Sequence, residues 1–398
     1  MGLERRCYAC DRMTEQPRAR CDCGEPLWFP VRPLEAWPAD GGPAGSIWRY
    51  GDVLPVDRPA GDLAPGGTPL LSVPALREET GLDLWLKDEG RNPTGSFKDR
   101  GSAVGVALSL ERATDGSFEG TTTEPARIAT VSHGNMALST AACAAAADLE
   151  ATVFVPEDIA SERLVAMGAL DPEIVRVRGD YGRLYHDVLE LGVRHGVTVC
   201  NSDVPSRVAG QKTLAFELLE AVSDLDAIVL PVSSGGNASA VWKGLLEMCA
   251  GGLCPDLPAL YLVQAAACDP IARAYRTDDD VVTPIDDPDV TVAYSIANAD
   301  PPSGTRALAA VRDTGGSVVS VDDDAILAAQ RRLATAGMRV EPSSATTLAA
   351  ITTLCESGSL EPGDRVAGVL TGRGYGGGGT EPESTVSTRD ALDAVFST

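Results

Sequence analysis

One lysine stands where a reactive amine could do chemistry. Lys98 lies within residues 92–101, between a strand-like run and a helix of small residues. A lysine forms an imine only when its amine is unprotonated and held in place. Gly95 permits close backbone approach, and Ser96 and Asp99 are suited to cap the following helix. An ordinary loop lysine is the alternative. The 33 basic residues, however, include only four lysines: Lys87, Lys98, Lys212 and Lys243. A chain so poor in lysine retains those that chemistry or structure requires.

Four cysteines near the start of the chain have the spacing of a metal site. Cys7 and Cys10 form a C-x2-C pair, and Cys21 and Cys23 form a C-x-C pair that Gly24 follows. Two thiolate pairs joined by a short loop suit tetrahedral zinc, and the glycine permits a tight turn. We therefore predict a zinc-ribbon-like module with a structural zinc. Reduced structural or redox cysteines are the alternative, because the spacing is short. The remaining cysteines have apolar or small neighbours typical of core thiols.

Two polar turns, each between a strand-like run and a helix, complete the set of candidate residues. The turn at 233–239 follows an apolar strand, so its backbone N–H groups and the dipole of the next helix suit a phosphate. On its own, a two-glycine turn is more often only a turn. The turn at 132–136 has the same placement. In an open parallel sheet, ligands bind at the carboxyl ends of strands, where both turns would lie.

Short apolar runs alternate with helical stretches along most of the chain, which predicts βαβ units and parallel sheets. The expected strands are 82–86, 128–131, 151–156, 174–177, 227–232, 260–263 and 367–370. The expected helices include 101–110, 137–147, 162–168 and a stretch that ends near 247. A stretch rich in proline and glycine at 30–67 is expected to form an extended arm packed on the body. The fold class is therefore α/β.

The segment around Lys98 resembles the pyridoxal-phosphate lysine motif of threonine synthases, in the tryptophan-synthase-β-like (fold type II) group of vitamin B6 enzymes. The resemblance continues in family order over roughly 60–375, through residues 86–89, 132–135, 201–202, 210–213, 234–237, 341–345 and 371–372. It implies two parallel-sheet α/β domains beside the zinc-ribbon-like module. We expect the module at 1–29, the arm at 30–67, a larger cofactor-binding domain at 68–110 plus 206–375, a smaller mobile domain at 111–205, and a flexible C-terminal tail with a short helix at 376–398.

The resemblance also implies a cofactor, pyridoxal 5′-phosphate, and a role for each matching residue. Lys98 would bind the cofactor covalently and move protons. The cofactor phosphate would lie at Ser234, Gly235, Gly236, Asn237 and Ala238. Asn135 would bind its 3′-hydroxyl, and Thr371 would place a hydroxyl against the pyridine nitrogen. The substrate would contact Ser132, His133, Asn201 and Arg207, the last as a bidentate phosphate clamp. His133 is otherwise either a satisfied hydrogen-bonding residue or a proton-transfer group.

The implied reaction converts O-phospho-L-homoserine and water to L-threonine and phosphate. Four positions depart from the family pattern: His133, Met136, Ala297 and Asp300. A site that loses an arginine at Ala297 and gains an acid at Asp300 holds a phosphate monoester less well. The alternative is a related β-elimination or replacement enzyme, such as a threonine or serine dehydratase or a cysteate-synthase-like enzyme. A cofactor-sensing pseudo-enzyme or zinc-ribbon binding protein is disfavoured, because Lys98 is present.

The net charge of −24 and the pI near 4.5 concern the surface rather than the substrate. Acidic residues are spread along the chain, a pattern that fits a halophilic protein whose carboxylates are screened by salt. Such a surface would repel nucleic acid. No apolar run of about 18 residues and no leader-like segment occurs, so we expect a cytoplasmic protein without a membrane partner. We expect a homodimer that acts on a small amino-acid substrate.

Overall fold

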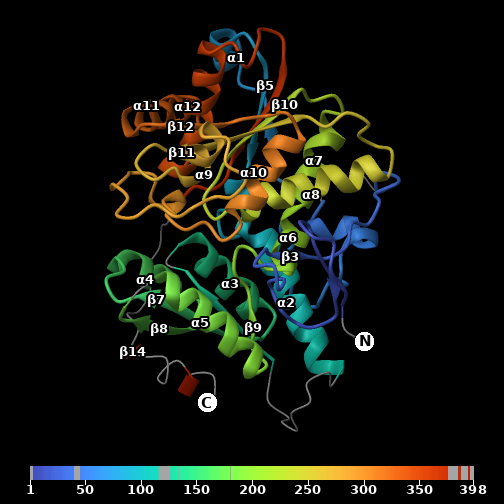
Figure 1. Cartoon of the computed structure of the whole chain (residues 1–398), viewed down its shortest axis with the longest axis vertical. Coiled ribbons are helices and arrows are strands. Elements are labelled where there is room, and N and C mark those ends of the chain that lie inside the picture. Colours follow the sequence, from blue (N-terminus) through green and yellow to red (C-terminus); the bar gives the residue numbers. More distant parts are fainter. Residues whose placement is uncertain are drawn as a thin grey trace.

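The computed structural model describes residues 3–39, 45–115, 126–132, 134–179, 181–374, 384–386 and 393–394. Figure 1 shows a larger α/β domain above a smaller one, with the N-terminal module at the side of both. No helix in the described part of the chain combines the length and the apolarity needed to span a membrane.

The N-terminal module is a three-stranded antiparallel sheet in the order β2-β1-β3. Its strands are β1 (Arg5–Cys7), β2 (Met13–Thr14) and β3 (Leu27–Trp28). The segment after it, which includes the 3-10 helix η1 (Ile47–Val53), lies along the larger domain. Arg49 and Tyr50 both bind Glu220 there, and the Leu34 N–H donates to the carbonyl oxygen of Glu247 at 3.0 Å. These contacts join the start of the chain to the body.

The larger domain contains a six-stranded sheet in the order β12-β11-β10-β13-β5-β4. The strands are β4 (Leu70–Leu71), β5 (Asp83–Asp88), β10 (Ala227–Pro231), β11 (Ala259–Ala265), β12 (Val318–Val321) and β13 (Arg365–Leu370). Every pairing is parallel except that of the edge strand β4 with β5. The sheet is therefore parallel apart from one antiparallel edge strand, and the expected α/β fold class is confirmed.

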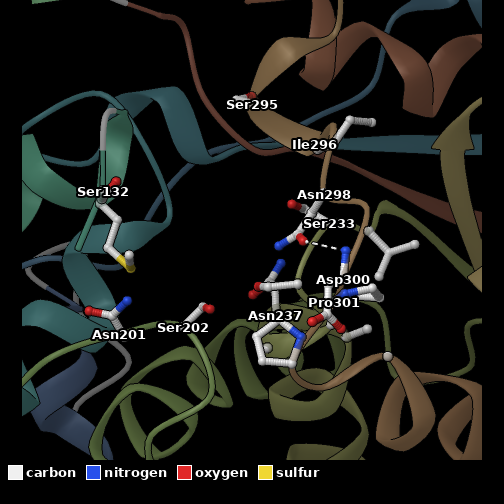
Figure 2. A pocket seen from close by; sticks show the side chains of 18 of the residues that line it. Ser132, Asn201, Ser202, Ser233, Asn237, Ser295, Ile296, Asn298, Asp300 and Pro301 are labelled. Atoms are coloured by element: carbon white, nitrogen blue, oxygen red, sulfur yellow. Dashed lines mark hydrogen bonds between the residues drawn. The ribbon is translucent and has the colours of Figure 1, made fainter. Parts of the chain in front are cut away.

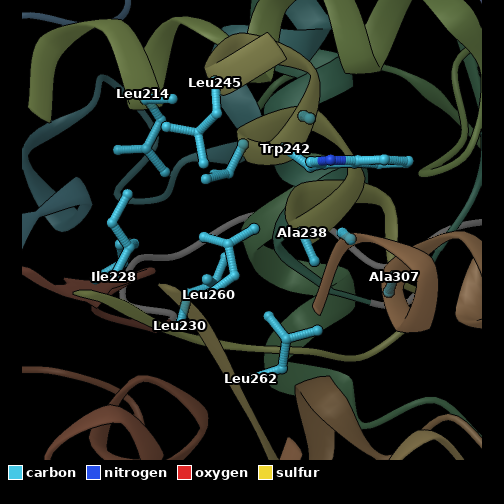
Figure 3. Packing of buried hydrophobic residues seen from close by; sticks show 14 of the residues in the cluster. Leu214, Ile228, Leu230, Ala238, Trp242, Leu245, Leu260, Leu262 and Ala307 are labelled. Atoms are coloured by element: carbon cyan, nitrogen blue, oxygen red, sulfur yellow. The ribbon is translucent and has the colours of Figure 1, made fainter. Parts of the chain in front are cut away.

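Helices cover both faces of this sheet, so its strands read as nearly continuous apolar runs. One face packs on α6 (Pro205–Gln211), α7 (Thr213–Ala221), α8 (Gly236–Ala250), α9 (Pro270–Arg276) and α10 (Gly304–Asp313). The other packs on α1 (Pro74–Thr80), α11 (Asp323–Thr335) and α12 (Pro342–Glu356). Alternate residues of β10 serve the two cores: Ile228 and Leu230 join the first, and Val229 the second. Figure 3 shows the first core between α8 and the sheet.

The smaller domain contains a parallel five-stranded sheet in the order β14-β8-β7-β6-β9. Its strands are β6 (Arg127–Val131), β7 (Glu150–Pro156), β8 (Glu173–Val177), β9 (Thr198–Val199) and β14 (Ser384–Val386). Helix α5 (Tyr181–Arg194) covers one face, and α3 (Asn135–Ala146) and α4 (Ser161–Gly168) cover the other. Strand β14 lies within 376–398, where we expected a flexible tail with a short helix. The expected short terminal helix lies almost entirely outside the described residues.

Candidate active site

A cavity of about 700 Å³ lies where the two domains face each other. Its wall includes residues at the carboxyl ends of β6, β10 and β13, which is where open parallel sheets bind ligands. Figure 2 shows Ser132 and Asn201 on one side of this cavity, with Asn237 and the 295–301 loop on the other. The predicted site residues on the wall are Lys98, Ser132, Asn135, Asn201, Ser234, Gly235, Gly236, Asn237, Ala238 and Thr371. The structure thus brings them together from both domains.

Lys98 is the first residue of α2 (Lys98–Asp115), and the turn before it fixes its place. Gly95 has a φ of 89°, and a Cβ there would come within 2.7 Å of the Arg373 side chain, so glycine is required. Asp99 accepts hydrogen bonds from the Thr94 N–H and hydroxyl at 2.7 and 2.5 Å, so its carboxylate holds the turn before the helix rather than capping the N–H groups of the helix. The Ser96 hydroxyl, expected to cap as well, has no partner among the described residues.

The Lys98 amine is poised near neutrality. Its pKa falls from 10.5 to about 7, chiefly because burial disfavours the charged form and secondarily because Arg207 is close. The Glu341 carboxyl opposes this shift in part. The Lys98 Nζ lies 4.4 Å from the centre of the Phe97 ring, so one side of the amine faces an apolar wall. Such an amine is substantially unprotonated at pH 7, as imine formation requires.

Arg207 lies behind Lys98 and not on the cavity wall. Its side chain is fully buried, and its Nη1 donates to the Ser102 hydroxyl at 2.8 Å. Its Nη2 donates to the backbone carbonyl of Lys98 at 3.1 Å. The expected clamp on a substrate phosphate is therefore not what this arrangement provides, because the guanidinium is used inside the protein. Arg207 instead holds the first turn of α2 and places a positive charge near the Lys98 amine.

The glycine turn at the start of α8 forms a cradle of backbone. Gly235 has a φ of 85°, and a Cβ on it would come within 2.2 Å of the Ser303 carbonyl oxygen. A Cβ on Gly236 would come within 2.1 Å of the Ser202 carbonyl oxygen. Both positions therefore need glycine, and the first N–H groups of α8 lie at the cavity with no partner in the preceding turn of a helix. The buried side-chain amide of Asn237 also has no partner among the described residues.

Two hydrogen-bonded groups fix the far wall. The Asn135 Nδ2 donates to Glu341 Oε1 at 2.9 Å, and the Ser295 hydroxyl donates to the same oxygen at 3.2 Å. Burial raises the pKa of Glu341, whose Oε2 has no partner among the described residues. At the end of β13, the Thr371 hydroxyl is hydrogen-bonded to the Ser344 hydroxyl at 2.9 Å. The side chain at this end of the strand is therefore a neutral hydroxyl and not a carboxylate.

Asn201 and Ser132, which were expected to contact the substrate, both form hydrogen bonds within the protein. The Asn201 amide is used on the end of β6: its Oδ1 accepts from the Val131 N–H at 2.9 Å, and its Nδ2 donates to the Val131 carbonyl at 3.2 Å. Asn201 therefore shapes the wall while its amide bonds the backbone. The Ser132 hydroxyl accepts from the Gly134 N–H at 3.2 Å. His133 lies outside the described residues.

Sequence reasoning missed several residues on the wall. Arg20 and Glu25 come from the N-terminal module, and His186 comes from α5. Arg20 donates to the Asp203 carboxylate at 3.1 Å and to the Pro302 carbonyl at 2.7 Å, so the module is tied to both domains. No local pattern reports such contacts. Glu341, in contrast, stands in one of the matching blocks and was open to detection.

Buried ion pairs support the elements beneath Lys98. Arg100, in the first turn of α2, pairs with Glu89 at 2.7 Å and with Glu217 at 2.6 Å. Lys87 donates to the same Glu217 at 2.7 Å. Farther along the fold, Lys212 and Lys243 both pair with Glu247. Removing one partner of such a pair leaves a buried charge uncompensated, at a cost of about 3–5 kcal/mol.

The N-terminal module gathers four thiols. The Sγ atoms of Cys7, Cys10, Cys21 and Cys23 all lie within 4.8 Å of one another. The Sγ atoms of Cys7 and Cys23 are 3.6 Å apart. Sulfur ligands about 2.3 Å from a shared zinc ion are separated by distances of this order. Four thiolates around one centre are the donor set of a structural zinc site.

Comparisons with known proteins identify the family of the chain. The family model for pyridoxal-phosphate dependent enzymes matches residues 62–372. The fold is similar to that of maize serine racemase, at a TM-score of 0.63 and 22% identity over 78% of this chain and 88% of that one. It is also similar to the processed form of a threonine deaminase from Solanum lycopersicum, at a TM-score of 0.63 and 19% identity over 77% and 84%. The chain belongs to the family of pyridoxal-phosphate dependent enzymes and is a lyase of that family.

The sequence relatives define the branch of the family. A threonine synthase of Methanosarcina acetivorans is 36% identical over 82% of this chain and 79% of its own length. A threonine synthase of Mycobacterium leprae is 34% identical over 91% and 94%. The resemblance to threonine synthases is confirmed by these relatives. The site fits the cofactor, because a buried amine, a backbone cradle that admits only glycine and an unpartnered amide surround one cavity.

Proposed function

We propose that this protein is a threonine synthase, which converts O-phospho-L-homoserine and water to L-threonine and phosphate. The observation that carries the proposal is the position of Lys98, a buried amine in a cavity shared by two domains. The threonine synthases that match most of the chain support the choice of reaction.

The chain supplies distinct places for the parts of pyridoxal phosphate. The turn of Ser234, Gly235, Gly236, Asn237 and Ala238 would hold the phosphate on backbone N–H groups at the start of α8. The Asn135 amide would take the ring hydroxyl, and the Thr371 hydroxyl would lie against the ring nitrogen. When bound, the cofactor supplies an electron sink for the α-carbon of the substrate. A neutral hydroxyl at the ring nitrogen favours elimination and replacement over other chemistry.

Lys98 would move the protons. With a pKa of about 7, roughly half of the amine is neutral at pH 7 and can accept a proton from the substrate α-carbon. The same Nζ would take a proton from the β-carbon while phosphate leaves the γ-carbon, and would give a proton to the γ-carbon, which becomes the methyl group. Water would then add at the β-carbon, and Nζ would return the last proton to the α-carbon. Arg207 acts as a positioning residue, since it bonds the Lys98 carbonyl and disfavours the protonated amine. Ser132 and Asn201 would border the substrate, together with His133.

A second function is favoured by other residues of the cavity wall. Ala297 and Asp300 both line the cavity, and Arg20 is the only arginine among the described lining residues. Arg20 already pairs with Asp203, so little free positive charge faces a phosphate monoester. These observations favour a dehydratase or replacement enzyme that acts on a smaller amino acid, such as threonine or serine.

Product analysis separates the two functions. The holoenzyme would be supplied with O-phospho-L-homoserine, L-threonine or L-serine in molar potassium chloride, and phosphate, threonine, ammonia and oxo acid would be measured. Equal release of phosphate and threonine supports the synthase. Ammonia and oxo acid from threonine or serine, with no turnover of O-phospho-L-homoserine, establishes the second function instead. A Lys98→Ala variant gives the background for every substrate.

The other expectations remain proposals with their own support. The four thiols of the N-terminal module would hold one structural zinc ion. The net charge of −24 would make stability depend on salt, as in halophilic proteins. The division into module, arm, two α/β domains and tail, the homodimer and the cytoplasmic location also remain proposals.

A further inference from the structure

A second cavity, of about 400 Å³, lies outside the candidate active site. Its walls come from the N-terminal module, from α2, from α5 with β9, and from the start of α6. The size lies within the usual range for small-molecule sites. We call it the arginine groove, because four of its described lining residues are Arg5, Arg18, Arg20 and Arg112.

These four arginines differ in their acidic partners. Arg18 pairs with Asp22, and Arg20 pairs with Asp203. Among the described residues, neither Arg5 nor Arg112 forms a close ion pair, although the charge of Glu111, next to Arg112 on α2, acts on Arg112. Arg5 is 5% exposed, and its Nη1 donates only to backbone carbonyls, at 2.8 to 3.3 Å.

Among its described lining residues, the groove therefore has an excess of positive charge. Glu190 is the only acid among the described lining residues, and it pairs with Arg194 at 3.1 Å. Arg5 and Arg112 both line this groove, and the Arg5 side chain is almost completely buried. Burial lowers the pKa of Arg112, and the neighbouring Glu111 opposes this shift. Two poorly hydrated guanidinium groups near each other would both be stabilised by an anion between them. In a chain with a net charge of −24, such a place stands out.

The rest of the groove is apolar. Phe29, Leu108, Leu189 and Val197 line it. Val193 also lines it and is 51% exposed, which makes it one of the few large apolar side chains open to solvent in the described residues. A site with a cationic end and an apolar wall complements a molecule with an acidic head and an apolar body.

We propose that the arginine groove binds a small amphipathic anion, with a carboxylate at Arg5 and Arg112 and an aliphatic or aromatic body against Val193. The site is separate from Lys98 and does not depend on which amino acid the enzyme uses.

The position of the groove gives the ligand a means of affecting the active site. Helix α5 belongs to the smaller domain, whereas the opposite walls belong to the N-terminal module and α2. His186 and Arg20 line both cavities. A ligand in the groove would thus bridge the module to the smaller domain, and any coupling between the two cavities must be reciprocal.

Calorimetric titration of the holoenzyme tests this with three probes: octanoate, octylammonium and acetate. Octanoate carries both the head and the body, octylammonium reverses the charge, and acetate lacks the body. We expect octanoate to bind at one equivalent per chain and the other two to bind at least tenfold more weakly. Arg112→Gln should weaken octanoate binding about ten- to a hundredfold, because it removes a charge-assisted contact. Arg183→Gln, the same change on α5 outside the groove, should leave the affinity unchanged.

A Val193→Glu variant places a negative charge on the wall and should also abolish octanoate binding. Thermal unfolding of each variant checks that the fold is intact. Equal affinity for octanoate and octylammonium overturns the proposal, as does unchanged octanoate binding in a folded Arg112→Gln variant. If the wild type binds no octanoate and Val193→Glu converts a dimer to a monomer in sedimentation, the groove is an interface between copies of the chain instead.

Discussion

The depressed pKa of Lys98 leads to a quantitative prediction about cofactor uptake. A lysine with the ordinary pKa of 10.5 is neutral to only about 0.03% at pH 7, whereas one with a pKa of about 7 is roughly half neutral. The reactive fraction at pH 7 is therefore on the order of a thousandfold larger than for an exposed lysine. Attachment of pyridoxal phosphate to the apoenzyme should accelerate about tenfold per pH unit below 7 and level off above it.

The assay traps the imine by borohydride reduction at timed intervals. Apoenzyme is mixed with cofactor at pH 5.5 to 9, reduced with borohydride at intervals, and digested so that the pyridoxyl group can be assigned to a peptide. The label should appear on Lys98, and Lys98→Arg should take up none. Arg207→Gln removes a positive charge whose presence lowers the pKa of Lys98, so the plateau should move to higher pH. A rate that keeps rising to pH 9 in the wild type, or a label on Lys87 or Lys212, would refute the reasoning.

Three further outcomes are expected. Gly236→Ala should weaken cofactor binding by about 1–3 kcal/mol in a fluorescence titration, because the new Cβ would lie 2.1 Å from the Ser202 carbonyl oxygen. The control is Gly51→Ala, whose Cβ would have no atom within 4 Å, and this variant should bind the cofactor normally. Metal analysis should find one zinc per chain, lost in a Cys7→Ser/Cys10→Ser variant; a metal-free wild type contradicts the zinc site. Thermal unfolding should shift upward from dilute buffer to molar potassium chloride, where the screening length is about 3 Å, and an unchanged midpoint would count against halophilic adaptation.

Local patterns were enough to predict most elements around the site. Strand β10 and the glycine turn after it are contiguous in the sequence. Their hydrophobic pattern and composition were therefore enough to predict both. Helix α2 begins at Lys98 rather than at 101, and the Asp99 carboxylate in its first turn binds Thr94 in the turn before it. Strand β4 was not predicted, because two residues are too few to show the alternating hydrophobic pattern of a strand.

Long-range contacts could not be predicted from such patterns. Arg20 reaches Pro302 across most of the chain, and only the folded arrangement of module and domains brings them within 2.7 Å. Arg207 has the type of side chain that binds phosphate, but the sequence did not show that this side chain is fully buried. Its guanidinium turns inward to Ser102 and the Lys98 carbonyl because α6 packs directly on α2.

The burial of the lysines limits where free pyridoxal phosphate can react with this enzyme. Lys87, Lys212 and Lys243 are each at most 3% exposed, and the fourth lysine faces the cavity. Pyridoxal phosphate is a free aldehyde, which condenses with any accessible neutral amine. Apart from its α-amino group, this chain offers solvent no such amine, so excess cofactor would react at one specific place rather than at many places on the surface. The same property makes amine-directed dyes and cross-linkers poor reagents for the folded protein.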